Sequence, residues 1–126
     1  MQVFKYNPVL YPMKLHVLKL TDVSEITNVY YKLNKKPLII AEMDSLIEMC
    51  VIEPVREIES NLVCILVLIL DESEIPVSSI AHEATHVARL LWSHLGESDV
   101  SMEADAYLVG WVTQCISDSL NNEITL

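Results

Sequence analysis

The feature that most constrains the fold is residues 62–70 (LVCILVLIL), a run of nine residues without a charged side chain, between Asn61 and Asp71. If this run is a strand, its side chains are apolar on both faces. A strand of this kind belongs in the middle of a sheet, or between a helix and another layer. It is far shorter than the ~20 residues that span a bilayer. Residues 50–58 are also β-prone, and the polar residues 59–61 predict a hairpin between the two runs.

The rest of the chain predicts a mixture of strand and helix. Residues 9–20 are typical of an extended segment, and residues 21–33 predict a helix. Residues 38–49 show no decisive period and are left unassigned.

The C-terminal half predicts two helices. The apolar period becomes helical over residues 78–95, and Gly96 stands where helices favour a left-handed residue. A loop over residues 97–100 leads to a second helical pattern over residues 101–120, which is apolar on most sides, and then to a polar tail. The expected class is α+β, with a small, mostly antiparallel sheet packed against these two helices.

Length and composition favour one soluble domain. A chain of 126 residues with 52% hydrophobic side chains predicts a single core over residues 1–126. The net charge of −10 leaves no basic surface for a phosphate backbone, so no nucleic-acid partner is expected. Three cysteines without a Cys-x-x-Cys pair favour a reducing compartment. Without a signal peptide or membrane span, the expected location is the cytoplasm, away from membranes.

The candidate chemistry lies in His82-Glu83-Ala84-Thr85-His86, an HExxH pattern within the first predicted helix. Residues four apart lie on the same helical face, so His82 and His86 can present two imidazoles to one Zn²⁺ ion. A helical wheel places them on one arc with Arg89 and Ser93. The apolar residues occupy another arc: Ile80, Ala81, Ala84, Val87, Ala88, Leu91 and Leu95. The competing interpretation is a solvated helix face that carries two histidines.

A catalytic zinc ion commonly has three protein ligands, and Glu103 is the favoured third candidate. The helix from His86 to Leu95 leads the chain ~14 Å away. Residues 97–101 can return at most ~17 Å, which is just sufficient for Glu103. Asp99 and Asp105 are the alternatives. Tyr107 lies one turn beyond Glu103 on the same side and is interpreted as core packing.

These two motifs resemble the gluzincins, in which a second helix after the HExxH helix supplies a glutamate ligand. Residues 79–86 and 103–110 look like the corresponding parts of small metallopeptidase-like proteins encoded by phages and prophages. The resemblance covers about residues 60–115. It implies a zincin-like fold, a zinc site on His82, His86 and Glu103, and hydrolysis of a peptide or protein substrate with Glu83 as general base and acid.

The sequence differs from the gluzincin pattern in two ways that affect the implied enzymatic function. The spacer from His86 to Glu103 is shorter than in thermolysin-like members, and Tyr107 stands where they have an acid that orients a ligand histidine. Almost nothing follows the second helix, so a protein partner could complete the cleft. The alternative functions are a catalytically degenerate zincin-like metal-binding module for regulation or interaction, and a metal-free acidic interaction domain.

Two polar residues outside the motifs receive ordinary interpretations. Arg89 is expected to pair with a nearby acid on the surface. His16 is interpreted as an ordinary strand histidine.

Overall fold

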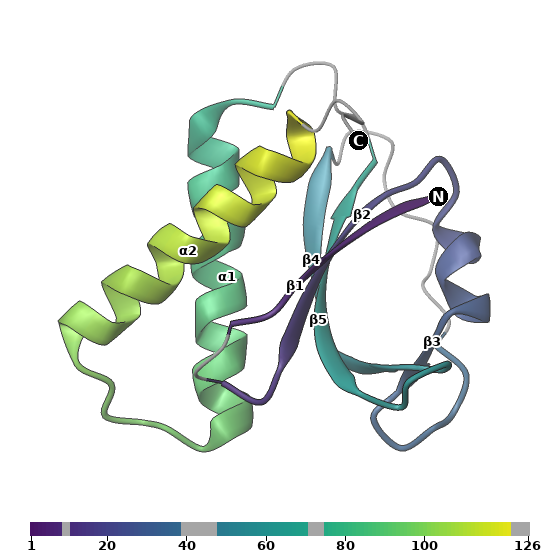
Figure 1. The fold of residues 1–126 in the computed structure, drawn as a ribbon, viewed down its shortest axis with the longest axis horizontal. Coiled ribbons are helices and arrows are strands. Elements are labelled where there is room, and N and C mark those ends of the chain that lie inside the picture. The colour runs from purple at the N-terminus through teal and green to yellow at the C-terminus, as the bar shows by residue number, and fades with distance from the viewer. Residues whose placement is uncertain (9–10, 39–47, 71–74, 122–126) are drawn as a thin grey trace.

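The computed structural model describes residues 1–8, 11–38, 48–70 and 75–121. Within these residues the chain is α+β, with a five-stranded, mostly antiparallel sheet and two C-terminal α-helices (Figure 1). The elements follow in the order β1 (Gln2–Tyr6), β2 (Lys14–Lys19), the 3-10 helix η1 (Val23–Asn28), β3 (Tyr30–Lys32), β4 (Met49–Glu57), β5 (Val63–Ile69), α1 (Val77–Leu95) and α2 (Met102–Leu120).

The apolar run 62–70 forms the central strand, as predicted. The strand order is β1-β2-β5-β4-β3. β5 pairs in parallel with β2 and antiparallel with β4, while β1–β2 and β3–β4 are antiparallel pairs. The predicted hairpin is therefore confirmed as β4–β5. Its register shifts between Ile52 and Val55, around Pro54, which has no amide hydrogen to donate to the ladder.

Both faces of the sheet are buried. Figure 1 shows α1 and α2 against one face and η1 against the other. Along β5, Ile65, Val67 and Ile69 belong to the core beneath the helices, whereas the alternate residues Cys64, Leu66 and Leu68 belong to the opposite core. This alternation explains why β5 is apolar at every position, because a strand between two layers has no solvent face.

Local signals set the ends of the two helices. α1 ends at Gly96, whose φ of 74° is left-handed, as predicted for the capping position. α2 begins after Ser101, whose side chain accepts a hydrogen bond from the amide of Ala104 at 3.1 Å. The helices cover residues 77–95 and 102–120, so the predicted bounds are confirmed to within a residue. Neither of these helices is both long and apolar enough to cross a bilayer.

The helix predicted over residues 21–33 is wrong. The structure has the short η1 there, followed by β3. Asp22 caps η1 by accepting a hydrogen bond from the amide of Ser24, and Tyr30 then pairs with Glu57 at the edge of the sheet. β-branched and aromatic residues favour strands, and residues 30–32 form backbone hydrogen bonds with the edge of β4. This pairing outweighs the weak helical period of the segment.

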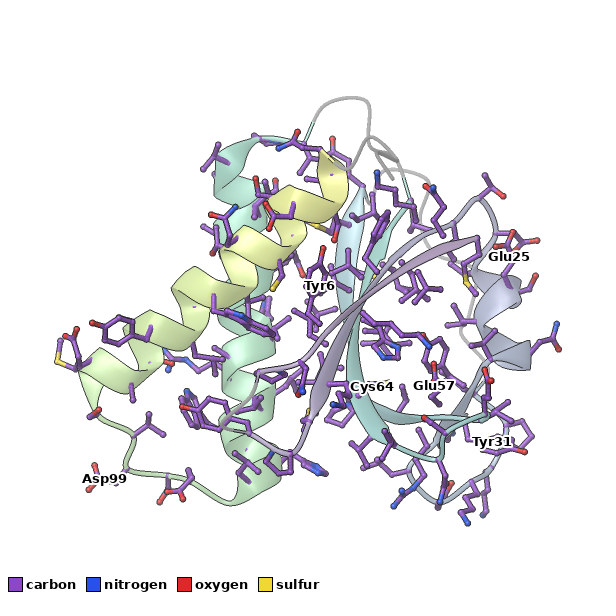
Figure 2. All side chains as sticks on the ribbon, viewed as in Figure 1. Tyr6, Glu25, Tyr31, Glu57, Cys64 and Asp99 are labelled. Carbon is purple, nitrogen blue, oxygen red and sulfur yellow. The ribbon has the colours of Figure 1, made fainter. Side chains whose placement is uncertain are left out.

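The N-terminal segment is also corrected. The extended segment expected over residues 9–20 is a strand only over β2, and residues 9–10 lie outside the described residues. β1 had no sequence-based prediction, yet it forms the outer strand beside β2. Figure 2 shows Tyr6 on β1 pointing into the space between the sheet and α2, where its hydroxyl lies 2.7 Å from Ser119 Oγ. The unassigned residues 38–49 lie largely outside the described residues.

Candidate metal centre

α1 carries a buried face and a polar face. His82, His86, Arg89 and Ser93 are exposed, as the wheel predicted. The buried residues are Ile80, Ala84, Val87, Ala88, Leu91 and Trp92. One position differs from the wheel, because Ala81 is exposed. The histidines are therefore available to an ion without disturbing the core.

The two imidazoles converge. Nε2 of His82 and Nε2 of His86 lie 3.1 Å apart, and the ring planes are inclined by 76°. Two nitrogens that each lie ~2.0–2.1 Å from a tetrahedral Zn²⁺ are ~3.3 Å apart. The same separation also suits a proton shared between the two rings. The pair thus fits two ligand positions of a zinc ion with little movement.

Glu83 lies beside this pair but is turned toward the sheet. Its carboxylate Oε1 is 3.8 Å from His82 Nε2, and only 14% of its side chain is exposed. Burial raises the pKa of Glu83, while the neighbouring His82 and His86 lower it to a smaller extent. The charge of Glu83 also adds to the burial that raises the pKa of Cys50 on β4 to about 11. Glu83 therefore lies between the ligand pair and the sheet, a position the wheel did not reveal.

The predicted third ligand, Glu103, lies on the first turn of α2 with an exposed side chain. In the part of the chain that the structure describes, no three His, Cys, Asp or Glu side chains form a group that could hold a metal ion. The structure thus brings His82, Glu83 and His86 together and leaves Glu103 apart from them. Glu103 makes no hydrogen bond or ion pair with the described residues, so its carboxylate is uncommitted.

Asp105, one of the alternatives, is committed to other contacts. Its Oδ2 lies 2.9 Å from Arg89 Nη1, and its Oδ1 accepts a hydrogen bond from Trp92 Nε1 at 2.9 Å. These contacts join the second helix to α1 one turn beyond His86. They also confirm that Arg89 pairs with a local acid. Asp99, the other alternative, lies on the α1–α2 connection and points away from the helices in Figure 2.

Tyr107 does not pack into the core. It is 73% exposed, so the prediction of core packing is wrong. The next residue, Leu108, is buried and carries the contact with the core instead. The helical period of α2 is apolar on most sides, and it therefore did not indicate which side faces the sheet.

The structure also shows a polar cluster that the sequence analysis missed. His16 lies on β2, as expected, but it is only 3% exposed, and its Nδ1 is 2.7 Å from the hydroxyl of buried Tyr30. Glu57 lies 3.9 Å from the same nitrogen and 2.8 Å from Lys5 Nζ. One signal was present in the sequence, namely a histidine inside an otherwise apolar strand, because a buried polar group requires a partner.

No protein-family model matches the sequence, and neither the curated proteins nor the solved structures give a match. The assignment of the site therefore depends on the chemistry and geometry of these residues.

Proposed function

We propose that this protein is a zinc-dependent metallopeptidase that hydrolyses peptide bonds with a metal-activated water. The observation that carries the proposal is the convergence of the His82 and His86 Nε2 atoms, 3.1 Å apart, beside the half-buried carboxylate of Glu83. Two imidazoles and one shielded carboxylate are the ligand pair and base that the HExxH pattern supplies in zinc hydrolases. A solvated helix face would not need the shielded acid.

Each residue has a distinct role in this proposal. Zinc, when bound, supplies a Lewis acid that polarises the scissile carbonyl and acidifies water. His82 and His86 hold the ion as neutral imidazoles. Glu83 takes the proton of the attacking water and transfers it to the amine of the leaving group. In the metal-free protein, burial raises the pKa of this carboxyl.

Glu103 remains the proposed third ligand. Its uncommitted carboxylate supports this choice over Asp105, whose two oxygens are both bound by α1. Recruiting Asp105 to a metal would break a charged hydrogen bond and leave Arg89 and Trp92 without their partner. The Glu103 carboxylate itself holds no such partner among the described residues, but it lies on the side of α2 away from Asp105, so it reaches the histidines only if α2 turns against α1.

The first experiment measures zinc per chain by mass spectrometry on untagged protein purified without chelator. The variants are His82→Ala and, as the matched control, His94→Ala, which removes another exposed histidine from the same helix. We expect about one zinc per chain in the wild type and the control, and its loss from His82→Ala. Protein that binds no zinc even after zinc is added back would overturn the proposal and favour a metal-free acidic interaction domain.

The third ligand is tested with carboxylate variants that preserve side-chain shape. Glu103→Gln is expected to weaken zinc affinity about tenfold or more, because a neutral amide is a poor ligand for Zn²⁺. Asp99→Asn is the control and should bind zinc as the wild type does. If Asp105→Asn weakens zinc binding and Glu103→Gln does not, Asp105 is the ligand and the assignment of Glu103 is wrong.

The second candidate function is a metal-binding module without turnover, for regulation or interaction. The separation of Glu103 from the histidine pair favours this binding module. Two histidines can hold an ion without the three protein ligands that a hydrolase commonly has. The two functions differ in one measurement. A zinc-loaded wild-type protein that cleaves no peptide in a diverse peptide library supports the binding module.

A further inference from the structure

We propose that a cavity on the sheet face opposite α1 and α2 binds a small oxyanion, a carboxylate or a phosphate, through Lys14 and His16. This sheet-face cavity has a volume of about 250 Å³. Its lining includes Lys5, Lys14, His16, Glu57, Ser60 and Cys64. The inference is independent of the metal centre, because none of these residues belongs to α1 or α2.

The alternation of the strands places these side chains on one face. In β2, Leu15 and Val17 enter the core beneath the helices, so Lys14 and His16 point to the other face. Lys5 is opposite His16, and Lys14 is opposite Cys64, in the ladder. Figure 2 shows Glu57 and Cys64 on the side of the sheet away from the helices. The apolar core beneath η1 covers the rest of this face, and the cavity lies beside it.

Hydrogen bonding fixes the proton on His16. Tyr30 is fully buried, and its hydroxyl has one partner among the described residues, His16 Nδ1 at 2.7 Å. Leaving a buried O–H donor without an acceptor costs more free energy than leaving one lone pair of an acceptor unused. Tyr30 therefore donates to Nδ1, and the neutral ring carries its hydrogen on Nε2. Nε2 has no partner among the described residues, so it remains free to donate to a ligand in the cavity.

The charges of the cavity also favour an anion. The Lys5 ammonium is held by Glu57 Oε2 at 2.8 Å, so this pair is neutral overall. Ser60 donates a further hydrogen bond to Glu57 Oε1 at 2.7 Å. Lys14 makes no ion pair with the described residues, so among the lining residues its ammonium is available to a ligand, although Glu59 also acts on the nearby Lys5. This is notable in a chain with 8 basic and 18 acidic residues.

The donor set and the size indicate the class of ligand. An ammonium and an imidazole N–H are both donors, and an oxyanion accepts from both. Pockets for drug-sized molecules have volumes of ~300–1,000 Å³. A cavity of about 250 Å³ suits a smaller ion or metabolite. The neutral His16 ring adds a directed donor without adding a charge that would have to be buried.

The test is a side-chain NMR titration of the intact protein with inorganic phosphate and, separately, with acetate, at constant ionic strength set by chloride. Before any addition, His16 is expected to show a proton on Nε2. Phosphate, acetate or both should then shift the His16 resonances saturably, and the arm that does so identifies the class of anion. Constant ionic strength removes general screening as a cause.

Lys14→Gln is expected to weaken binding about tenfold or more, since it removes a charged hydrogen-bond donor. Lys14 is only partly buried, so this variant should fold. Lys36→Gln is the matched control, because it makes the same charge change at an exposed position outside the cavity. A proton on Nδ1, no saturable shift with either anion, or equal affinity in Lys14→Gln and wild type would each overturn the proposal. Zinc content should be the same in both variants, so failure here is distinct from failure of the metal site.

Discussion

At the scale of single residues, Glu83 separates metal binding from chemistry. His82 and His86 are exposed and could serve any site that holds an ion, whereas Glu83 is withdrawn against the sheet. In the metal-free protein, burial raises the pKa of Glu83, because the charged form is less well solvated than in water. A purely structural metal site has no use for such a group beside its first ligand.

Glu83→Gln therefore tests catalysis alone. The amide keeps the size of the side chain but cannot take a proton, so kcat should fall about 10²- to 10⁴-fold while zinc content is unchanged. Peptide hydrolysis and zinc per chain are measured on the same preparation. Glu97→Gln, at an exposed position beyond the end of α1, is the control and should retain wild-type turnover. Full activity in Glu83→Gln would show that another group acts as the base.

His16 makes a prediction about pH. Burial lowers the pKa of His16 to about 4, with Lys5 and Lys14 adding to this effect and Glu57 opposing it. An unfolded histidine has a pKa of about 6.5, so between these values the unfolded chain binds a proton that the folded chain does not. The free energy of unfolding should thus decrease as the pH falls from about 6.5 to about 4.

Urea unfolding across this pH range measures the effect. His16→Gln should lose much of the pH dependence, although it is also less stable at neutral pH, whereas His94→Gln at an exposed position should keep the wild-type slope. Glu57 adds to the pH dependence of stability at lower pH. Burial raises its pKa, but hydrogen bonds from Lys5 and Ser60 outweigh burial, and the pKa is lowered overall. The stabilisation from Glu57 is therefore lost only as the pH falls below its ordinary pKa. An unchanged slope in His16→Gln would contradict the assignment of a buried neutral ring.

At the scale of elements, the ends of the helices position the site. Gly96 reverses the chain after α1, and Ser101 starts α2 five residues later, which brings Asp105 onto Arg89 and Trp92. This contact fixes the rotation of α2 against α1. It also explains why Asp105, rather than Glu103, meets α1, since two residues along a helix are separated by about 200°.

The two glycines of the chain make a matched pair of predictions. Gly96→Ala should cost about 1–2 kcal/mol, because a φ of 74° is strained for an L-residue even where its Cβ meets no atom. Gly110→Ala lies inside α2 with equally open space and should stabilise the protein by about 0.5–1 kcal/mol. Urea unfolding of both variants checks the signs. Equal changes would contradict the role of Gly96 as the left-handed cap.

At the scale of the whole molecule, stability depends on a sheet with a core on each face. β5 contributes to both, because its alternate residues enter opposite cores. The helices that carry the candidate metal centre pack on one of these cores, and the sheet-face cavity lies beside the other. The two proposed sites are thus separated by the sheet itself.

Leu66→Ala is expected to destabilise the protein by about 2–5 kcal/mol, because Leu66 is fully buried in the centre of the opposite core. Leu62→Ala, at a 52% exposed position before the same strand, is the control and should change stability by less than about 1 kcal/mol. The measurement is the midpoint of urea unfolding. Equal effects of the two substitutions would contradict the central placement of β5.

The sequence by itself determined the features that depend on neighbours along the chain. These are the central apolar strand, the β4–β5 hairpin, the capped helix with His82 and His86 on one face, and the start of α2 at Ser101. Periodicity and capping are local properties, so they can be derived from adjacent residues.

Only the tertiary structure decided which distant side chains meet. It placed Glu83 against the sheet, Asp105 on α1, Tyr107 in solvent and His16 on Tyr30, and it replaced a predicted helix over residues 21–33 with η1 and β3. Each of these outcomes depends on how elements far apart in the chain rotate and pack against one another. Such contacts outweigh local preferences because burial and paired polar groups contribute more free energy than propensity does.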